Sequence, residues 1–373
     1  MIQNSQNAAD YLRLTLADNI GAKTFAAVVE YFGSLPDALA NPLARWKKVP
    51  GIGPKKLAAL EAVTDATVAE ELELAKSQKV AIITLDDSRY PAALKHIHNP
   101  PALLYVKGEL TPEDALAIGV VGSRSCTHYG SEQARRFGGL LGRAGFTVIS
   151  GGARGIDTAA HTGSLRAGGR TIAVMGCGLI HNYPAENAEM YRDIVEQKKG
   201  CLISELPMRT SAMSGNFPTR NRIISGMSLG VLLVEAAVPS GALITANDAI
   251  EQGKEIFAIP GRVDSPTSAG TNKLIREQCA SLVTDLDDIL GPLEEVGRKM
   301  KPADQTDQPA AIPQGLDELE SKIFAMLEGQ TLSLDEVVRA TGEQVGPVAS
   351  ALTMLVIKSH VEQQPGNVFG RKR

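Results

Sequence analysis

The segment at residues 217–225, with the sequence FPTRNRIIS, places two cations and an amide directly before an apolar pair. Guanidinium groups bind phosphate oxygens through charge-assisted hydrogen bonds, and an aromatic ring stacks on a base or on a cation. Cations next to an aromatic ring and an amide are therefore suited to binding a nucleotide chain. The candidate residues are Phe217, Arg220, Asn221 and Arg222. Alternatively, an arginine has a structural role as the ion-pair partner of Glu205 or Glu235. We expect this role for at least one of the arginines.

Glycine-containing turns follow several apolar runs and could present backbone N–H groups to an anion. One turn combines glycine with a hydroxyl and a guanidinium at 122–124, and another places Ser-Gly at 240–241 before a helical stretch. Amides, a hydroxyl and a guanidinium together bind phosphate. The expected contacts are Gly122, Ser123, Arg124, Ser240 and Gly241. The glycine pair at 151–152 should allow close backbone approach, with Arg154 as a second anion contact.

Residues for catalysis or metal binding are less evident. Asp157 and His161 are four positions apart and could do acid–base chemistry, but such a pair is more often a helix cap with a hydrogen-bonded partner. The chain has no Ser-His-Asp order, metal-ligand cluster or isolated carboxylate pair. The turn at 122–124 is not G-x-G-x-x-G, and no ATP-hydrolysing P-loop motif occurs. We predict a binding site with no catalytic residue, metal or cofactor.

A parallel sheet would bring these turns together. Six runs rich in Val, Ile and Leu alternate with helical stretches, which indicates strands buried on both faces in βαβ units. The runs are ALAIGVVG, FTVISG, TIAVMG, CLISE, LGVLLVEA and EIFAIPG. We predict a Rossmann-like, doubly wound, mostly parallel α/β sheet at residues 79–292. In such a sheet, ligands bind at the carboxyl ends of the strands.

The N-terminal residues 1–70 read as a helical domain with a helix-hairpin-helix at VPGIGPKKLAAL, residues 49–60. Its glycines could bring backbone N–H groups and a phosphate together at a helix N-terminus. A degenerate first copy lies at 18–33, and the whole domain at 1–70 is expected to be similar to a sterile-alpha-motif domain. The alternative, a helical hairpin used only for packing or protein contacts, stays open.

The C-terminal part begins with a segment rich in Pro, Gln and charge, which we interpret as a linker at residues 293–313. Residues 314–373 follow a winged-helix pattern, with helices expected at 333–340 and 347–359. This domain has eight acidic and six basic residues. Because few donors are available for base edges, it is expected to contact protein more than duplex DNA.

Composition sets the broad class. The chain has 373 residues, enough for two or three domains, and its net charge of −4 argues against a protein coated in cations. The four cysteines are isolated, as in reduced proteins. No signal peptide opens the sequence and no stretch is long and apolar enough for a membrane span. We therefore expect a cytoplasmic protein with no membrane contact.

At these residues the sequence resembles the DNA-processing protein A family, known as DprA or Smf. The motifs that carry the resemblance occur in order over about residues 79–290: GSRSCTHYG, SGGARGIDTAAH, GGRTIAVMGCG, SELP, FPTRNRIIS, SGALITA, EQGKEIFAIPG and GTNKLI. The resemblance implies a dimer that binds single-stranded DNA and loads the recombinase RecA during natural transformation. It also implies a set of DNA-binding residues: Gly122, Ser123, Arg124, Phe217, Arg220, Asn221 and Ser240.

An enzyme is the main alternative. The Rossmann-like sheet and the double-glycine turn are also similar to nucleotide phosphoribohydrolases of the "lonely guy" type. Those enzymes use a P-G-G-x-G-T-x-x-E loop, whereas this chain has SGGARGID with no glutamate at the matching position. A third possibility, a duplex-specific regulator acting through the winged helix, is weakened by the acidic count of that domain.

A homodimer is expected from the last strand-and-helix unit of the central domain. The sequence GTNKLIREQCASLVTDLDDIL has many apolar residues for the edge of a sheet. A surplus of them would form a patch that a two-fold partner covers. The residues expected at this interface are Leu274, Leu282, Leu286 and Ile289.

Overall fold

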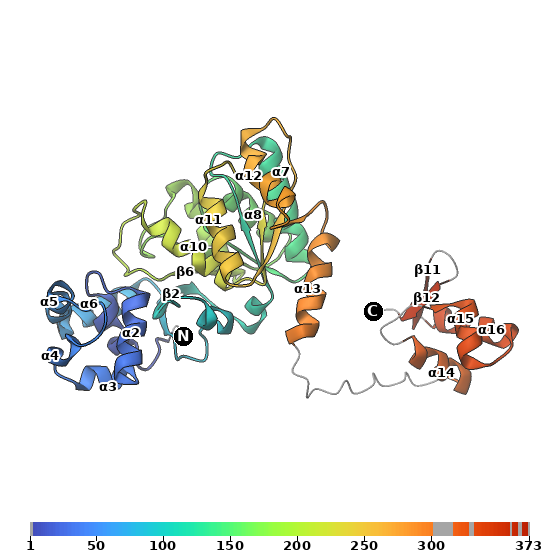
Figure 1. Cartoon of the computed structure of the whole chain (residues 1–373), viewed down its shortest axis with the longest axis horizontal. Helices are drawn as coiled ribbons and strands as arrows, with labels where there is room; N and C mark the ends of the chain where they lie inside the picture. The colour runs from blue at the N-terminus through green and yellow to red at the C-terminus, as the bar shows by residue number, and fades with distance from the viewer. Residues whose placement is uncertain (1–2, 301–315, 328–331, 359, 365–367, 372–373) are drawn as a thin grey trace. The chain divides into compact units, whose positions relative to one another are not determined.

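The computed structural model describes residues 3–300, 316–327, 332–358, 360–364 and 368–371 (Figure 1). The chain divides into two compact units, Met1–Arg298 and Lys299–Arg373. Within the described residues, no helix is both long enough and apolar enough to cross a membrane.

The first unit begins with six helices. They are α1 (Ala8–Thr15), α2 (Ala22–Phe32), α3 (Leu35–Ala40), α4 (Leu43–Trp46), α5 (Pro54–Ala62) and α6 (Asp65–Ser77). The glycine turn that the sequence predicts lies between α4 and α5, where Gly51 has φ of +82° and Pro54 opens the helix. Lys56 on α5 donates a hydrogen bond to Thr24 on α2 (2.7 Å), which ties the two glycine-led helices together.

The sheet of the first unit has nine strands in the order β1-β2-β6-β5-β4-β3-β7-β8-β9. They are β1 (Val80–Thr84), β2 (Leu103–Gly108), β3 (Ala117–Val121), β4 (Thr147–Ser150), β5 (Thr171–Val174), β6 (Gly200–Ser204), β7 (Gly230–Leu233), β8 (Glu255–Ala258) and β9 (Ser281–Leu282). From β6 to β9 all neighbours are parallel, whereas β1 and β2 pair antiparallel at the edge. The predicted doubly wound, mostly parallel sheet is confirmed, and all six predicted runs are strands.

Helices cover both faces of this sheet (Figure 1). They are α7 (His128–Arg143), α8 (Ile156–Arg166), α9 (Ala188–Glu196), α10 (Asn216–Gly226), α11 (Gly241–Glu251), α12 (Ala269–Arg276) and α13 (Asp287–Met300), with short 3-10 turns at Ala92–His96, Pro112–Ala115, Ala185–Asn187 and Pro266–Ser268. Alternate residues of β3 enter different cores: Val121 packs with Ile224 of α10, and Val120 packs with Phe137 of α7. This alternation explains why the central strands are apolar without interruption.

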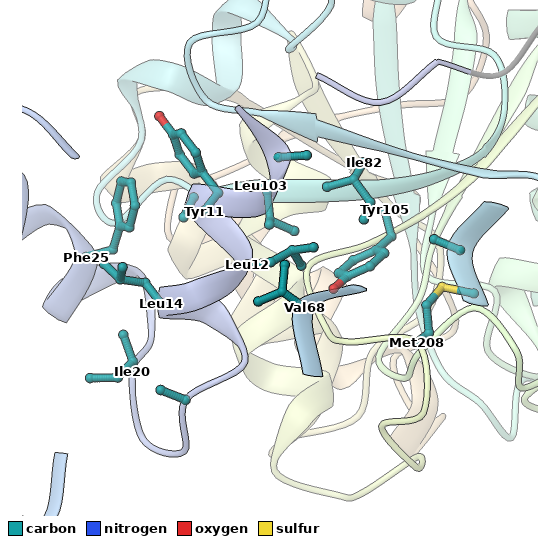
Figure 2. Close-up of a cluster of buried hydrophobic side chains, with 14 of the residues drawn as sticks. Tyr11, Leu12, Leu14, Ile20, Phe25, Val68, Ile82, Leu103, Tyr105 and Met208 are labelled. Atoms are coloured by element: carbon teal, nitrogen blue, oxygen red, sulfur yellow. The ribbon is translucent and has the colours of Figure 1, made fainter. Parts of the chain in front are cut away.

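The N-terminal helices share a hydrophobic core with the edge of the sheet. Figure 2 shows Leu12 and Val68 beside Leu103 and Tyr105 of β2, with Met208 close to them. At this junction the buried carboxylate of Glu71 on α6 accepts hydrogen bonds from the Tyr105 hydroxyl (2.8 Å) and the Met208 N–H (2.7 Å). The loop after β6 is therefore held by the N-terminal helices.

Two sequence interpretations need correction in this unit. The predicted linker at 293–313 starts too early, because α13 continues to Met300; residues 301–315 lie outside the described part of the chain. The expected apolar interface patch is also largely wrong, since Ile289 is fully buried, Leu274 is 8% exposed and Leu286 is half-buried. These side chains pack inside the protomer, against the sheet, and of the four residues only Leu282 is exposed (47%).

The described residues of the second unit form three helices and a small sheet. Its elements are α14 (Glu318–Met326), β10 (Leu332–Ser333), α15 (Leu334–Thr341), α16 (Val345–Ile357), β11 (Val361–Gln364) and β12 (Val368–Arg371), with strand order β10-β12-β11. Ser333 and Glu336 form a capping box that begins α15, and Gly342 ends it with φ of +73°. Helices occupy both predicted helical segments, although Ser359 at the predicted end lies outside the described residues.

The Glu71 junction yields a stability prediction. Glu71→Ala leaves the Tyr105 hydroxyl and the Met208 N–H buried without their acceptor, so we expect a loss of about 1–3 kcal/mol in the free energy of unfolding for each donor. The measurement is urea denaturation of the full chain. Glu73→Ala on the exposed side of the same helix is the control and should change the value by less than about 0.5 kcal/mol. Equal effects from both variants would contradict the anchoring role.

Candidate functional site

The order of the strands creates a crevice at one end of the sheet. The chain passes from β3 through β4 and β5 to β6 in one direction, then returns to place β7 on the other side of β3. Ligands bind in doubly wound sheets at the carboxyl ends of strands where the order reverses in this way. A cavity of about 590 Å³ lies at this point, lined by the turns after β3 and β7 and by α10. Each of the two turns was predicted from its glycine.

At the start of α10, the Phe217 ring contacts a guanidinium and a second aromatic ring at the cavity. We call this group of Tyr183, Phe217 and Arg124 the column. The guanidinium carbon of Arg124 lies 4.7 Å from the centre of the Phe217 ring, and the Tyr183 ring lies 5.6 Å from it. All three residues line the cavity, and Arg124 is exposed. Gly176 makes room for the column, because a Cβ there would lie 2.7 Å from the Phe217 ring. Tyr183 was not predicted as a site residue, although its ring type was a usable signal.

The cavity is also lined by the N-terminus of α11. Ser240 is the N-cap residue, yet its side chain makes no capping bond, and its buried Oγ has no hydrogen-bond partner among the described residues. The Asn221 amide donates to the Gly241 carbonyl (3.3 Å), which links α10 to the start of α11. The first N–H groups of a helix are free to bind an anion. Ser240 therefore places a hydroxyl without a partner among the described residues at the start of α11, next to the cavity.

Arg220 is a buried cation in the wall of the cavity. Its side chain donates hydrogen bonds to the carbonyls of Gly151 (2.6 Å) and Val174 and to the Asn221 side chain (3.1 Å). Burial lowers the pKa of Arg220 to about 10, against the attraction of Asp157. Gly151 is needed to admit these groups, because a Cβ there would lie 2.4 Å from the guanidinium. The predicted close approach to the backbone at Gly151 is thus made by Arg220.

Arg222 points away from the cavity. It forms two hydrogen bonds with the Glu205 carboxylate, at 2.7 and 2.8 Å, and a third with the Asn99 carbonyl (3.1 Å). The expectation that at least one arginine is a strut paired with Glu205 or Glu235 is confirmed for this residue. Arg222 does not line the cavity, which corrects its inclusion among the binding residues.

Asp157 and His161 both act inside the fold. Burial raises the pKa of Asp157, opposed by the nearby Arg220, and its carboxylate accepts from the Ala153 N–H (3.2 Å). Burial lowers the pKa of His161 to about 3, so its imidazole is neutral, and Nδ1 lies 2.6 Å from the Thr171 hydroxyl. Arg154 pairs with Glu186 at the surface. Among the described residues, no group of acids, histidines and cysteines could hold a metal.

A second, smaller cavity lies across α10 from the first. It has a volume of about 200 Å³ and is lined by Asn216, Thr219 and Ile223 of α10 together with Ile20 and Phe25 of the N-terminal helices. The two cavities share the residue Arg220 in their walls. Helix α10 thus separates the crevice from the N-terminal helices.

Comparison with known proteins identifies the family. Residues 81–294 match the family described as DNA recombination-mediator protein A, and residues 307–367 match the DprA winged helix domain. Protein Smf of Synechocystis sp. is 32% identical over 400 residues, covering 99% of this chain and 100% of that protein. DNA processing protein DprA of Bacillus subtilis is 40% identical over 221 residues, covering 59% of this chain and 73% of that protein.

Solved structures agree with this assignment. DNA processing protein A of Streptococcus pneumoniae has a TM-score of 0.67 and 32% identity, covering 77% of this chain and 98% of that one. DNA processing protein A of Helicobacter pylori has a TM-score of 0.50 and 28% identity, covering 55% of this chain and 93% of that one, and is described by its single-stranded DNA binding mode. From its sequence and its fold alike, this chain belongs to the DNA recombination-mediator protein A family, DprA or Smf.

Proposed function

We propose that this protein binds single-stranded DNA in the cavity between β3 and β7, without catalysing a reaction on it. The observation that carries the proposal is the column of Tyr183, Phe217 and the exposed Arg124, in the same cavity as Ser240, whose hydroxyl has no partner among the described residues. Stacking surfaces and phosphate-binding cations are the two components of single-strand recognition. A duplex keeps its base faces stacked inside the helix, so the column favours an unpaired strand.

The relative from Helicobacter pylori supports the proposal, because it is described as a binder of single-stranded DNA. A phosphoribohydrolase activity has less support. The imidazole of His161 is buried within the fold, and burial holds its pKa at about 3, too low for acid–base work near neutral pH. The Asp157 carboxylate lies at the wall of the cavity, but it is next to Arg220 and accepts a hydrogen bond from the Ala153 N–H. Incubation with nucleoside monophosphates tests this directly, since an enzyme of that type releases free base.

We further propose that the protein delivers the bound strand to the recombinase RecA and works as a homodimer. The support for the recombinase is membership of a family described as recombination mediators. With DNA and a recombinase as partners, we expect it to work in the cytoplasm. Two crevices on one assembly would engage one strand together and raise its affinity by avidity.

The surface that we propose for the dimer is the free edge of the sheet beside β9. A groove of about 470 Å³ runs there, lined by residues that include Ile250, Ile275, Cys279 and Leu282. Ile250 is 46% exposed and Leu282 is 47% exposed. An edge strand with exposed apolar neighbours is suited to a two-fold partner that pairs with it or covers it.

The DNA proposal predicts a clear effect at Arg124. Arg124→Ala should weaken binding of an oligothymidylate by about 1–3 kcal/mol, roughly 5- to 150-fold, because one charge-assisted phosphate contact is lost. The slope of affinity against salt should become shallower as well. Fluorescence anisotropy over a salt series measures both.

Arg166→Ala is the matched control, since Arg166 is exposed near the end of α8, the helix whose start lines the cavity. It should leave the affinity within about twofold of the parent. Equal losses from both variants would indicate unspecific charge attraction. A folded Arg124→Ala protein with unchanged affinity would remove this residue from the site.

Arg220 should behave differently from Arg124. Arg220→Ala leaves Asp157 buried without its cation, so we expect the free energy of unfolding to fall by about 3–5 kcal/mol, as measured by urea denaturation. Adding Asp157→Asn should recover part of the loss, because the unpaired charge is then removed. A stable Arg220→Ala protein that loses DNA affinity would instead make Arg220 a direct contact.

The dimer proposal predicts the effect of charging the groove. Leu282→Glu with Ile250→Glu should give a folded monomer, because both side chains are exposed and charges in an apolar interface repel a two-fold partner. Light scattering after gel filtration measures the mass. Val263→Glu is the control, because Val263 is 98% exposed and lies outside the groove. A persistent dimer in the double variant would put the interface elsewhere.

A further inference from the structure

A buried carboxylate occupies the N-terminus of α7, the helix that follows β3. Glu235 comes shortly after β7, and its two carboxylate oxygens accept from the backbone N–H of Thr127 (2.8 Å) and from the Thr127 hydroxyl (2.5 Å). Thr127 is the N-cap of this 16-residue helix, and its hydroxyl oxygen also accepts from the Gly130 N–H (3.1 Å). At the start of α7, the N–H groups of Thr127 and Gly130 are thus already bound by side chains of the protein itself.

The helix end and Gly130 accommodate the buried charge of Glu235. The residue is 2% exposed, and no cation among the described residues forms an ion pair with it. The helix end and its N–H groups therefore supply the compensation that a buried anion requires. Gly130 leaves the necessary space, because a Cβ at this position would lie 2.4 Å from the carboxylate carbon.

The Glu235 carboxylate occupies the place where this type of fold normally binds a phosphate group. In doubly wound sheets, the pyrophosphate of a bound nucleotide sits at the N-terminus of the helix after the first strand of the switch point. Here β3 and α7 are that strand and helix. The Glu235 carbonyl also accepts from the Ser123 N–H (2.8 Å), which holds the turn after β3 across the helix end.

We propose that Glu235 is a specificity-determining residue that closes the phosphate site of α7 to free nucleotides. Its carboxylate acts as an internal anion in the place of a pyrophosphate. The N-terminus of α11, where Ser240 has an unused hydroxyl, is then the helix end left for a phosphate of the strand. The choice of that phosphate position rests on the proposed DNA binding, whereas the closure of α7 does not.

The experiment compares substitutions that empty or fill the same space. Glu235→Ala removes the carboxylate, and we expect it to gain saturable binding of sodium pyrophosphate at least about tenfold tighter than in the parent protein. Glu235→Gln keeps the shape without the charge and should gain no such binding, because the site stays filled. Isothermal titration without DNA measures all three proteins, and circular dichroism checks their folding.

Glu235→Asp decides the question if the alanine variant does not fold, since its shorter side chain withdraws the carboxylate and should also open the site. A folded Ala or Asp variant without any gain would overturn the proposal. So would a parent protein that binds pyrophosphate as tightly as the alanine variant does. If the parent protein does not bind oligothymidylate, the proposed function is contradicted. The proposal for Glu235 is not, because the pyrophosphate titration contains no DNA.

Discussion

The buried guanidinium of Arg220 connects most of the elements that form the crevice. It reaches the carbonyls at the ends of β4 and β5, lies near Asp157 on α8, and bonds Asn221, which in turn contacts the start of α11. A buried charge is stable only when its partners are in place. The positions of α8, α10 and α11 at the carboxyl end of the sheet are therefore interdependent, and Phe217 is fixed one turn before this network.

The N-terminal helices support the crevice from behind. Their core reaches Met208 in the loop after β6, and Glu71 holds the backbone of that loop by a hydrogen bond. The loop leads directly into α10, whose far side faces the N-terminal helices across the smaller cavity. Packing far from the cavity between β3 and β7 thus determines the position of Phe217 in that cavity. A helical domain with this position contributes to the site even where it contacts no ligand.

The sequence was sufficient for the architecture because uninterrupted apolar runs have few alternatives to buried parallel strands. It did not separate the roles of Arg220 and Arg222, which are two positions apart on a helix and therefore point in nearly opposite directions. Only the packing of α10 shows that one enters the core and the other meets Glu205. The apolar residues of α12 and α13 posed the same problem, since composition does not tell a core face from an interface. The antiparallel β1 and β2 were missed because their runs precede the repeating pattern.

The contact between Arg124 and Phe217 has a further consequence for the speed of recognition. An arginine side chain that is free in solution loses rotamer freedom when it is immobilised, at a cost of about 0.5–1.5 kcal/mol. Here the ring already orients the planar guanidinium before any ligand arrives. The guanidinium is thus held at the cavity in one orientation, where the proposed phosphate contact would be made. On the proposed binding of a single strand, association would then require little rearrangement of this side chain, which favours a faster rate than a surface that must first reorganise.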